Sequence, residues 1–251
     1  MESLNLWGSN LGDEGLKTIS SGLSGNNSLS KLDLGWNSLS AAGVTELVQI
    51  LSRSNISTLN VAWNQFGDEG TRQIAQALKT SKIQHLNLWG TGTKDAVSDL
   101  VTALKGTNSL SSLSLQNNEL SSEAVSLICA LLKENRSLAC LDLRANPLTE
   151  EDVAQIASAL KANSTLKSID LQNTSISSTG FQLIAEALRA NKSLETILLQ
   201  WNNIDDDAAK LLLEVLDVNV ILKTIDLQGN PLNVSTSLEI QKKLTLPHRK
   251  Q

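Results

Sequence analysis

The chain has 251 residues, of which 41% are hydrophobic and 19% are charged, and its formal net charge is −5. This acidic balance argues against a nucleic-acid partner, because proteins that bind nucleic acids present a basic face to the phosphates. Cys129 and Cys140 are too few for a disulfide framework, and no apolar run approaches the roughly 18 residues that a membrane span needs. We therefore expect a cytoplasmic protein that does not enter the membrane.

One short pattern recurs along the whole chain. Residues 29–39 read LSKLDLGWNSL, which is L-x-x-L-x-L-x-x-N-x-L, and similar copies occupy residues 56–66, 83–93, 110–120, 138–148, 166–176, 194–204 and 222–232. A partial copy opens the chain. The central apolar residues are 27 or 28 positions apart, and they are Leu4, Leu32, Leu59, Leu86, Leu113, Leu141, Ile169, Ile197 and Ile225. A fixed period with this pattern is the signature of a leucine-rich repeat solenoid.

Each repeat is predicted to begin with a short strand and to continue as a helix. In residues 31–34, alternation sends Leu32 and Leu34 inward, and Lys31, Asp33 and Gly35 outward. Helices are predicted at residues 41–52, 68–80, 94–105, 122–134, 149–163, 179–190, 205–218 and 237–246.

Local polar residues support these boundaries. Thr149 is a plausible N-cap with Asp152 three residues later, and Asn163 can end that helix. We expect the Asn of each pattern, for example Asn118, to be buried and bonded to backbone groups that the turn leaves unpaired. At Ser9, Thr91 and Thr174 only a hydroxyl is available, which predicts local weakening.

The predicted fold class is α/β. We expect a leucine-rich repeat solenoid, a horseshoe arc of about nine repeats, with a parallel β-sheet on the concave face and helices on the convex face. The repeats predict a single domain over residues 1–251. Because the chain opens inside a repeat without a capping element, we also expect it to be part of a longer protein.

The period of 27–28 residues resembles the ribonuclease-inhibitor-like class of leucine-rich repeats, as in NLR receptors, ribonuclease inhibitor, RanGAP, tropomodulin and eukaryote-like bacterial effectors. The resemblance implies a solenoid that binds a protein ligand on its concave face, because aromatic residues of that face contact the ligand in ribonuclease inhibitor. This chain lacks the many cysteines of ribonuclease inhibitor, so inhibition of ribonucleases is not expected.

Nearly all aromatic residues of the chain lie where strands end. It has five Trp, two Phe and no Tyr, and each Trp follows the last apolar residue of a strand by one or two positions. Such rings either stack on neighbouring repeats or form a partner-binding stripe; we favour the stripe, because Trp is enriched among interface hot spots. The candidate residues are Trp7, Trp36, Trp63, Trp89 and Trp201.

The later repeats should present a more polar face. We expect partner contacts there from Gln116, Asp142, Arg144, Asp170, Gln172 and Gln200, and from His85 in an earlier repeat. Asp142, Asp170 and Arg144 also allow a solvated, salt-bridged surface. An apolar part beside a polar part suits a protein ligand with an apolar anchor and a polar remainder.

The sequence offers no catalytic constellation. The two histidines, His85 and His248, are not placed with a nucleophile, and no phosphate-binding, zinc or redox motif occurs. We therefore predict no catalytic residue, metal or cofactor, and a non-catalytic protein-interaction module, such as a ligand-sensing region of an NLR-type receptor. The alternatives are a bacterial effector that binds host proteins, a GTPase-activating protein of the RanGAP type, and an actin-binding module like tropomodulin.

Overall fold

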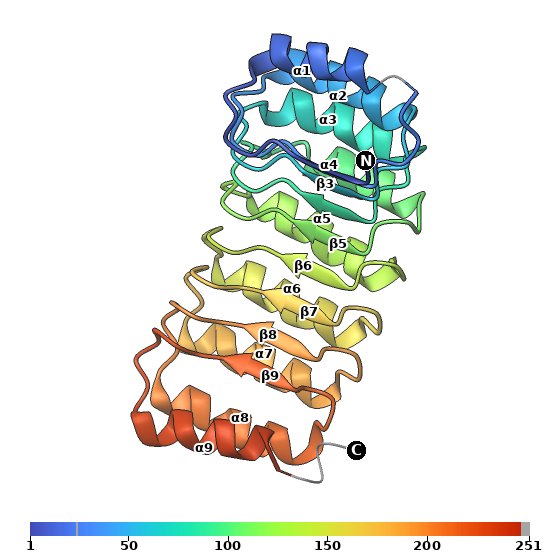
Figure 1. Ribbon diagram of the computed structural model, residues 1–251. Helices are drawn as coiled ribbons and strands as arrows, with labels where there is room; N and C mark the ends of the chain where they lie inside the picture. Colours follow the sequence, from blue (N-terminus) through green and yellow to red (C-terminus); the bar gives the residue numbers. More distant parts are fainter. Residues whose placement is uncertain (24, 247–251) are drawn as a thin grey trace. The chain divides into compact units, whose positions relative to one another are not determined.

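The computed structural model describes residues 1–23 and 25–246, so His248 lies outside the described residues. Strands and helices alternate throughout this part of the chain (Figure 1). Their order is β1 (Ser3–Asn5), α1 (Gly12–Gly22), β2 (Lys31–Asp33), α2 (Ala41–Ser52), β3 (Thr58–Asn60), α3 (Gly67–Leu78), β4 (His85–Asn87), α4 (Val97–Lys105), β5 (Ser112–Ser114), α5 (Ser122–Glu134), β6 (Cys140–Asp142), α6 (Glu150–Ala162), β7 (Ser168–Asp170), α7 (Ser178–Ala190), β8 (Thr196–Leu198), α8 (Asp206–Val218), β9 (Thr224–Asp226) and α9 (Val234–Leu244). The predicted α/β repeat fold is confirmed.

The chain forms two compact units, Met1–Leu127 and Ile128–Gln251, and α5 spans the boundary between them. In unit 1 the strands β1 to β5 pair in parallel in chain order. In unit 2 the strands β6 to β9 pair in the same way. That residues 1–251 act as one domain stays a prediction.

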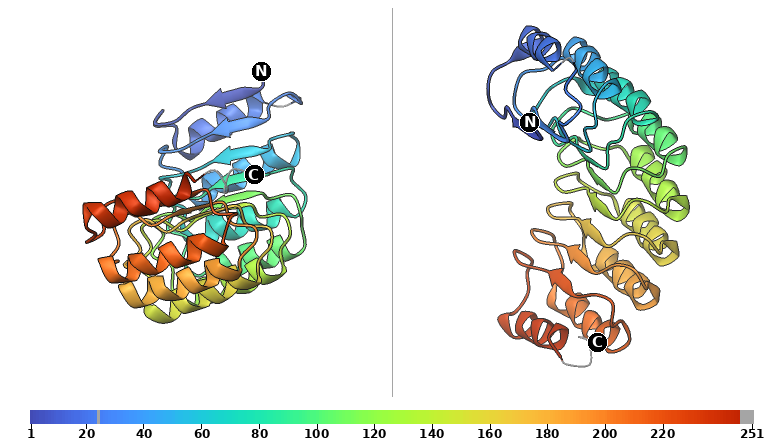
Figure 2. Two further views of the ribbon diagram at one scale, coloured as in Figure 1. Left: turned by 90° about the horizontal axis from the view of Figure 1, so that it is seen from below. Right: turned by 45° about the vertical axis from the view of Figure 1, so that its right-hand side comes forward.

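The register places equivalent residues of successive repeats side by side. Leu4 pairs with Leu32, and Leu32 with Leu59, so the central apolar residues form one row, in which Leu4 is partly exposed. Leu32 and Leu59 are each 1% exposed. Within each unit, the helices cover one face of the strands and leave the other face open (Figure 2). The outward-pointing strand residues therefore lie on a face that no helix of the same unit covers.

The helix at Glu150–Ala162 begins as predicted. The Thr149 hydroxyl accepts a hydrogen bond from the backbone N–H of Asp152, and the Asp152 carboxylate accepts one from the backbone N–H of Thr149. This capping box satisfies two of the N–H groups that a helix start leaves unpaired.

Three helix predictions differ from the structure. Helix α1 was not predicted, although it forms in the same place within its repeat as the later helices and buries Leu16. Helix α4 begins at Val97 rather than at residue 94, since the Asp68 carboxylate accepts hydrogen bonds from the backbone N–H groups of Lys94 and Ala96 and holds these residues against the preceding repeat. Helix α9 starts at Val234, three residues earlier than predicted.

Candidate functional site

Each strand except β8 ends in a turn to which a side chain of the same strand is hydrogen-bonded. Asp33 Oδ1 accepts a hydrogen bond from the backbone N–H of Gly35 at 3.0 Å, and Asp142 Oδ1 accepts one from Arg144 at 2.9 Å. The equivalent acceptors in other repeats are Asn5, Asn60, Asn87, Ser114, Asp170 and Asp226. The sequence suggested Asp142 and Asp170 as partner contacts. Their carboxylates also accept hydrogen bonds that stabilise the turns after their own strands.

The Asn of each pattern ties neighbouring repeats together. The Asn64 amide donates to the carbonyls of Leu34 and Val61 at 2.9 Å, and its oxygen accepts from the backbone N–H groups of Asn37 and Leu39. The burial of this position is confirmed, since Asn64 is fully buried. These asparagines hold the turns rigid beneath the residues that follow each strand.

The residue before this Asn position has a left-handed backbone in every repeat. Its φ lies between +51° and +77°, and the residues are Gly8, Trp36, Trp63, Gly90, Asn117, Ala145, Asn173, Trp201 and Gly229. This conformation costs a residue with a Cβ about 1–2 kcal/mol, while Gly and Asn adopt it routinely. Trp36, Trp63 and Trp201 thus adopt a left-handed backbone conformation that is unfavourable for a residue with a bulky side chain. Strained residues of this kind cluster at functional sites.

The indole rings lie on glycines of neighbouring repeats. A Cβ on Gly35 would approach the Trp7 ring to 2.1 Å, and one on Gly8 would lie 3.5 Å from the Trp36 ring, so the two repeats interlock. Trp63 lies over Gly90 in the same manner. The glycines therefore leave room for the rings, and stacking on neighbouring repeats is part of the arrangement.

Much ring surface nevertheless remains open. Trp36 is 65% exposed, Trp63 40% and Trp7 39%. These three rings line a hollow of about 380 Å³ on unit 1. Trp89 lies beside it, with its ring centroid 5.3 Å from that of Trp63 in an edge-to-face arrangement. We call the surface formed by Trp7, Trp36, Trp63 and Trp89 the tryptophan surface.

The indole N–H groups of this surface are available. Within residues 1–23 and 25–246, none of the five Trp side chains donates a hydrogen bond. A buried Trp N–H usually finds an acceptor. A ligand that covers the rings would therefore gain by bringing acceptor groups.

His85 and Gln116 differ in accessibility. His85 lies on β4 and is exposed, in register with Thr58 on β3. Gln116 is 8% exposed, so it offers little surface to a ligand. Lys31 on β2 is exposed as well, although it was not among the predicted contact residues.

The polar candidates of unit 2 bond mainly to one another. Arg144 lies 3.9 Å from both Asp142 and Asp170, and Gln172 Nε2 donates to Asp170 at 2.9 Å. Burial raises the pKa of Asp170, and the negative charge of Asp142 acts in the same direction, against the Gln172 hydrogen bonds and Arg144. This group forms a paired polar cluster on the open face of unit 2.

Two further candidates of unit 2 lie in the next repeat. Gln200 Nε2 donates to Asp226 at 2.8 Å. Trp201 is 65% exposed and lies against Gly229, and it is the single Trp in the sequence of unit 2. Beside them Leu198 is half-buried, in the position where β7 and β9 carry aspartate. Trp201 is therefore a local match to Trp36 without the neighbouring rings.

Sequence reasoning missed a second row of asparagines in unit 2. The Asn163 amide donates to the carbonyl of Leu132 at 2.6 Å, while its oxygen accepts from the backbone N–H of Leu166 at 2.7 Å. Asn191 and Asn219 make the equivalent bonds. Their spacing of 28 residues is visible in the sequence and was the signal for this row.

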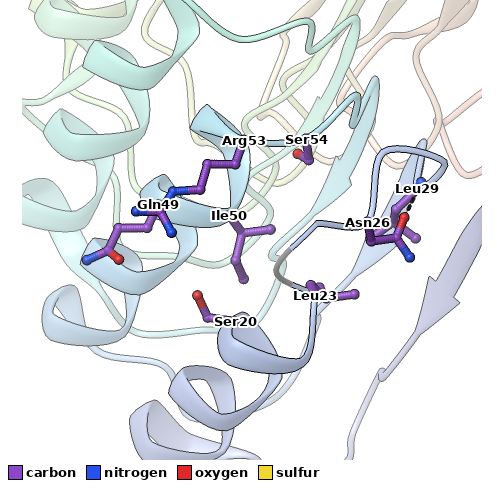
Figure 3. Close-up of a pocket in the computed structure, with 8 residues that line it drawn as sticks. All are labelled: Ser20, Leu23, Asn26, Leu29, Gln49, Ile50, Arg53 and Ser54. Carbon is purple, nitrogen blue, oxygen red and sulfur yellow. Dashed lines mark hydrogen bonds between the residues drawn. The ribbon is translucent and has the colours of Figure 1, made fainter.

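In unit 1 Asn26 occupies the first position of this row, and its side-chain oxygen accepts from the backbone N–H of Leu29. Arg53, Thr80 and Thr107 occupy the positions that follow. Figure 3 shows the small pocket at this edge, lined by Ser20, Leu23, Asn26, Leu29, Gln49, Ile50, Arg53 and Ser54. Its volume is about 20 Å³, which suffices for a single water molecule. It is too small for a ligand.

The described residues contain neither a cluster of three or more potential metal ligands nor a helix long and apolar enough to cross a membrane. Both cysteines are free thiols; Cys129 is buried and Cys140 is exposed. The burial of Cys129 agrees with its position in the apolar part of the predicted helix.

Comparisons with known proteins agree with this architecture. Among solved structures, a protein from Bacteroides fragilis has a TM-score of 0.60 at 18% identity, over 98% of this chain and 72% of that one. Leiomodin-1 actin-binding site 2 has a TM-score of 0.52 at 18% identity, over 60% of this chain and 90% of that one. A third structure, the TLR13–ssRNA13 complex, has a TM-score of 0.51 at 18% identity, over 94% of this chain and 34% of that one.

At these identities the likeness concerns the fold. No curated protein matches the sequence significantly. The sequence model of the family described as Leucine Rich repeat matches residues 1–20, 25–48, 54–75 and 190–213. Together with the period of 27–28 residues and the parallel strands that each precede a full helix, this match identifies the chain as a leucine-rich repeat protein of the ribonuclease-inhibitor-like class.

Proposed function

We propose that this chain is a non-catalytic protein-binding module whose ligand covers the tryptophan surface of unit 1. The observation that carries the proposal is that Trp7, Trp36 and Trp63 line one hollow while remaining partly exposed. Trp36 and Trp63 have a left-handed backbone that is unfavourable for Trp, although Gly or Asn occupies the same turn position in other repeats. Strain of this kind persists when another requirement maintains it.

The energetics suit an interface. Burying a Trp ring removes about 150–250 Å² from water, and aromatic anchors of this kind dominate binding energy at interfaces. The three rings would form the apolar centre, and the exposed Lys31 and His85 would lie at its rim. The polar cluster of Asp142, Arg144, Asp170 and Gln172, with Gln200, is proposed as a separate contact surface on unit 2.

A ligand-sensing region of an NLR-type receptor is the context we favour, and a bacterial effector that binds host proteins is the alternative. The support for either is the ribonuclease-inhibitor-like repeat. We propose the cytoplasm as the compartment, because both cysteines are free thiols.

Actin binding is a second candidate, favoured by the likeness to leiomodin-1 actin-binding site 2. Co-sedimentation of the chain with actin filaments tests it, and a chain that stays in the supernatant rules it out.

Single-stranded RNA is a further ligand class to consider, because one of the structures of similar fold is a complex of TLR13 with ssRNA13. The net charge of −5 opposes such a ligand here, so we expect no retention on immobilised RNA at physiological salt.

The test of the main proposal compares three folded baits in a pull-down followed by affinity measurement. They are the wild type, the Trp36→Asn/Trp63→Asn double variant and the control Trp201→Asn. Asn is chosen because Asn117 and Asn173 occupy the same left-handed position. We expect a partner that wild type and Trp201→Asn retain and that the double variant loses. Equal retention by all three baits would refute the tryptophan surface as the binding site.

A further inference from the structure

The hollow between Trp7, Trp36 and Trp63 has features that select among ligand chemistries. Resting on the proposed function, we infer that its ligand is a proline-rich segment in the polyproline II conformation, running across the strands of unit 1. Three observations support this class: the spacing of the strands that carry the rings, the state of the indole N–H groups, and the hydrogen bonds that already engage Asn5, Asn60 and Asn87 at the strand ends.

The spacing of the repeats matches the ligand. Neighbouring parallel strands lie about 4.8 Å apart. Trp7 and Trp63 follow β1 and β3, which are two repeats apart and therefore separated by roughly 9.6 Å. A polyproline II helix advances about 3.1 Å per residue, or about 9.3 Å per three-residue turn. Prolines three positions apart would thus meet Trp7 and Trp63 in turn, while the Trp36 ring lies between them.

The free indole N–H groups suit the same ligand. A polyproline II helix makes no internal hydrogen bonds, so all its backbone carbonyls are available acceptors. Trp7, Trp36 and Trp63 provide apolar ring faces and N–H donors that bond nothing within the described part of the chain. Aromatic grooves that bind proline-rich segments combine these two properties and use the preformed helix to limit the entropy lost on binding.

Competing ligand chemistries fit less well. A carbohydrate needs free polar side chains, but Asn5 and Asn87 hold their turns, and both amide atoms of Asn60 are engaged. A quaternary ammonium group favours an aromatic cage with negative charge nearby. Here Asp33 Oδ1 already accepts from Gly35 and Asn60, and Lys31 adds positive charge on the same strand.

The test is a calorimetric titration of the folded chain with a capped peptide of about ten L-prolines, which spans about 31 Å as a polyproline II helix. The D-proline peptide is the matched control, because it has the same composition and forms the mirror-image helix. We expect binding of the L-peptide only. Trp36→Asn should weaken it by about tenfold or more, whereas Trp201→Asn, with the same exposure and backbone conformation, should leave it unchanged.

Three results would overturn the inference: no binding of the L-peptide at millimolar concentration, equal binding of both enantiomers, or equal loss in the two variants. Failure of the proposed function looks different. If wild type retains a protein partner in a Trp36-dependent manner and the L-proline peptide does not displace it, the protein-binding function stands and the ligand belongs to another class. If no partner depends on Trp36 and no peptide binds, both proposals fall.

Discussion

The Trp7 ring lies so close to Gly35 of the next repeat that a Cβ at position 35 would come within 2.1 Å of it. We therefore predict that Gly35→Ala displaces the Trp7 ring and lowers the free energy of unfolding by about 1–3 kcal/mol, the usual effect of overpacking. Denaturant unfolding measures the loss, and the Trp fluorescence maximum should shift as the ring moves.

A double-mutant cycle isolates this contact. In a Trp7→Ala background, Gly35→Ala should cost far less, with a coupling energy of about 0.5–3 kcal/mol. Gly22→Ala is the control, since a Cβ there meets no atom within 4 Å. Additive effects of Trp7→Ala and Gly35→Ala would contradict the predicted clash.

Asn118 anchors the turn of the preceding repeat. Its side-chain oxygen accepts from the backbone N–H groups of Thr91, Gly92 and Thr93, and its amide donates to the Leu88 carbonyl. Asn118→Ala leaves these buried groups unpaired, so we predict a loss of about 1–3 kcal/mol in the free energy of unfolding. The exposed Asn27→Ala is the control, and an unchanged melting temperature for Asn118→Ala would rule out this role.

The fold could be predicted from sequence because its signal is repeated. Each copy of the pattern places apolar residues at the same strand positions, so the register of β1 to β5 follows from aligning the copies. Helix α1 was not predicted, because the pattern before it is only a partial copy. Its packing against α2 stabilises it, so this helix depends on tertiary contacts.

The site was predictable only in part. The clustering of Trp at strand ends is visible in the sequence, but the left-handed backbone of Trp36 and the position of Trp7 over Gly35 require coordinates. The aspartates looked like surface charges, yet Asp33 and Asp142 bond the turns that follow them. Which polar residues remain available to a partner depends on such local bonds, and sequence alone does not reveal them.

Asp206 links α8 to α9 and makes stability sensitive to acid. Hydrogen bonds from the Thr236 side chain and the Asn233 backbone lower the pKa of Asp206 from 3.8 to about 2. Because the folded-state pKa is depressed, the contribution to stability is complete above about pH 4 and is lost as the pH falls toward 2. Asp206→Asn should therefore lower the melting temperature at pH 5 and approach wild type near pH 2.

The control for this experiment is Ser235→Ala, which changes an exposed, uncharged residue of α9. We expect the difference between Ser235→Ala and wild type to stay nearly constant with pH, because this change removes no titratable group. If the difference between Asp206→Asn and wild type is equally constant from pH 5 to pH 2, the Asp206 carboxylate has no special role.

The two thiols should differ in reactivity. Burial raises the pKa of Cys129 to about 12 and also raises that of the more accessible Cys140. Since the thiolate is the reactive form, we predict that a disulfide reagent labels one thiol in the native protein, more slowly than free cysteine, and two in denaturant. Cys140→Ser should abolish native labelling, and rapid labelling of both thiols would contradict the burial of Cys129.

Trp36 and Trp63 share a backbone conformation but differ in packing, so their replacement separates structure from binding. Trp36 is 65% exposed, and Trp36→Asn relieves a left-handed strain of about 1–2 kcal/mol. Its unfolding free energy should equal or exceed that of wild type. Both variants lose the packing of a ring over a glycine, Gly8 for Trp36 and Gly90 for Trp63. Trp63→Asn gains the same relief but also loses the edge-to-face contact with Trp89, worth about 0.5–1.5 kcal/mol.

Urea unfolding of the two variants decides between the two explanations for the tryptophan row. A stable Trp36→Asn that no longer binds a partner means that the ring is maintained for binding at a cost in stability. If Trp36→Asn instead loses as much stability as Trp63→Asn, inter-repeat stacking accounts for both rings. The binding surface would then have to be sought in the polar cluster of unit 2, where Arg144→Ala removes the central cation.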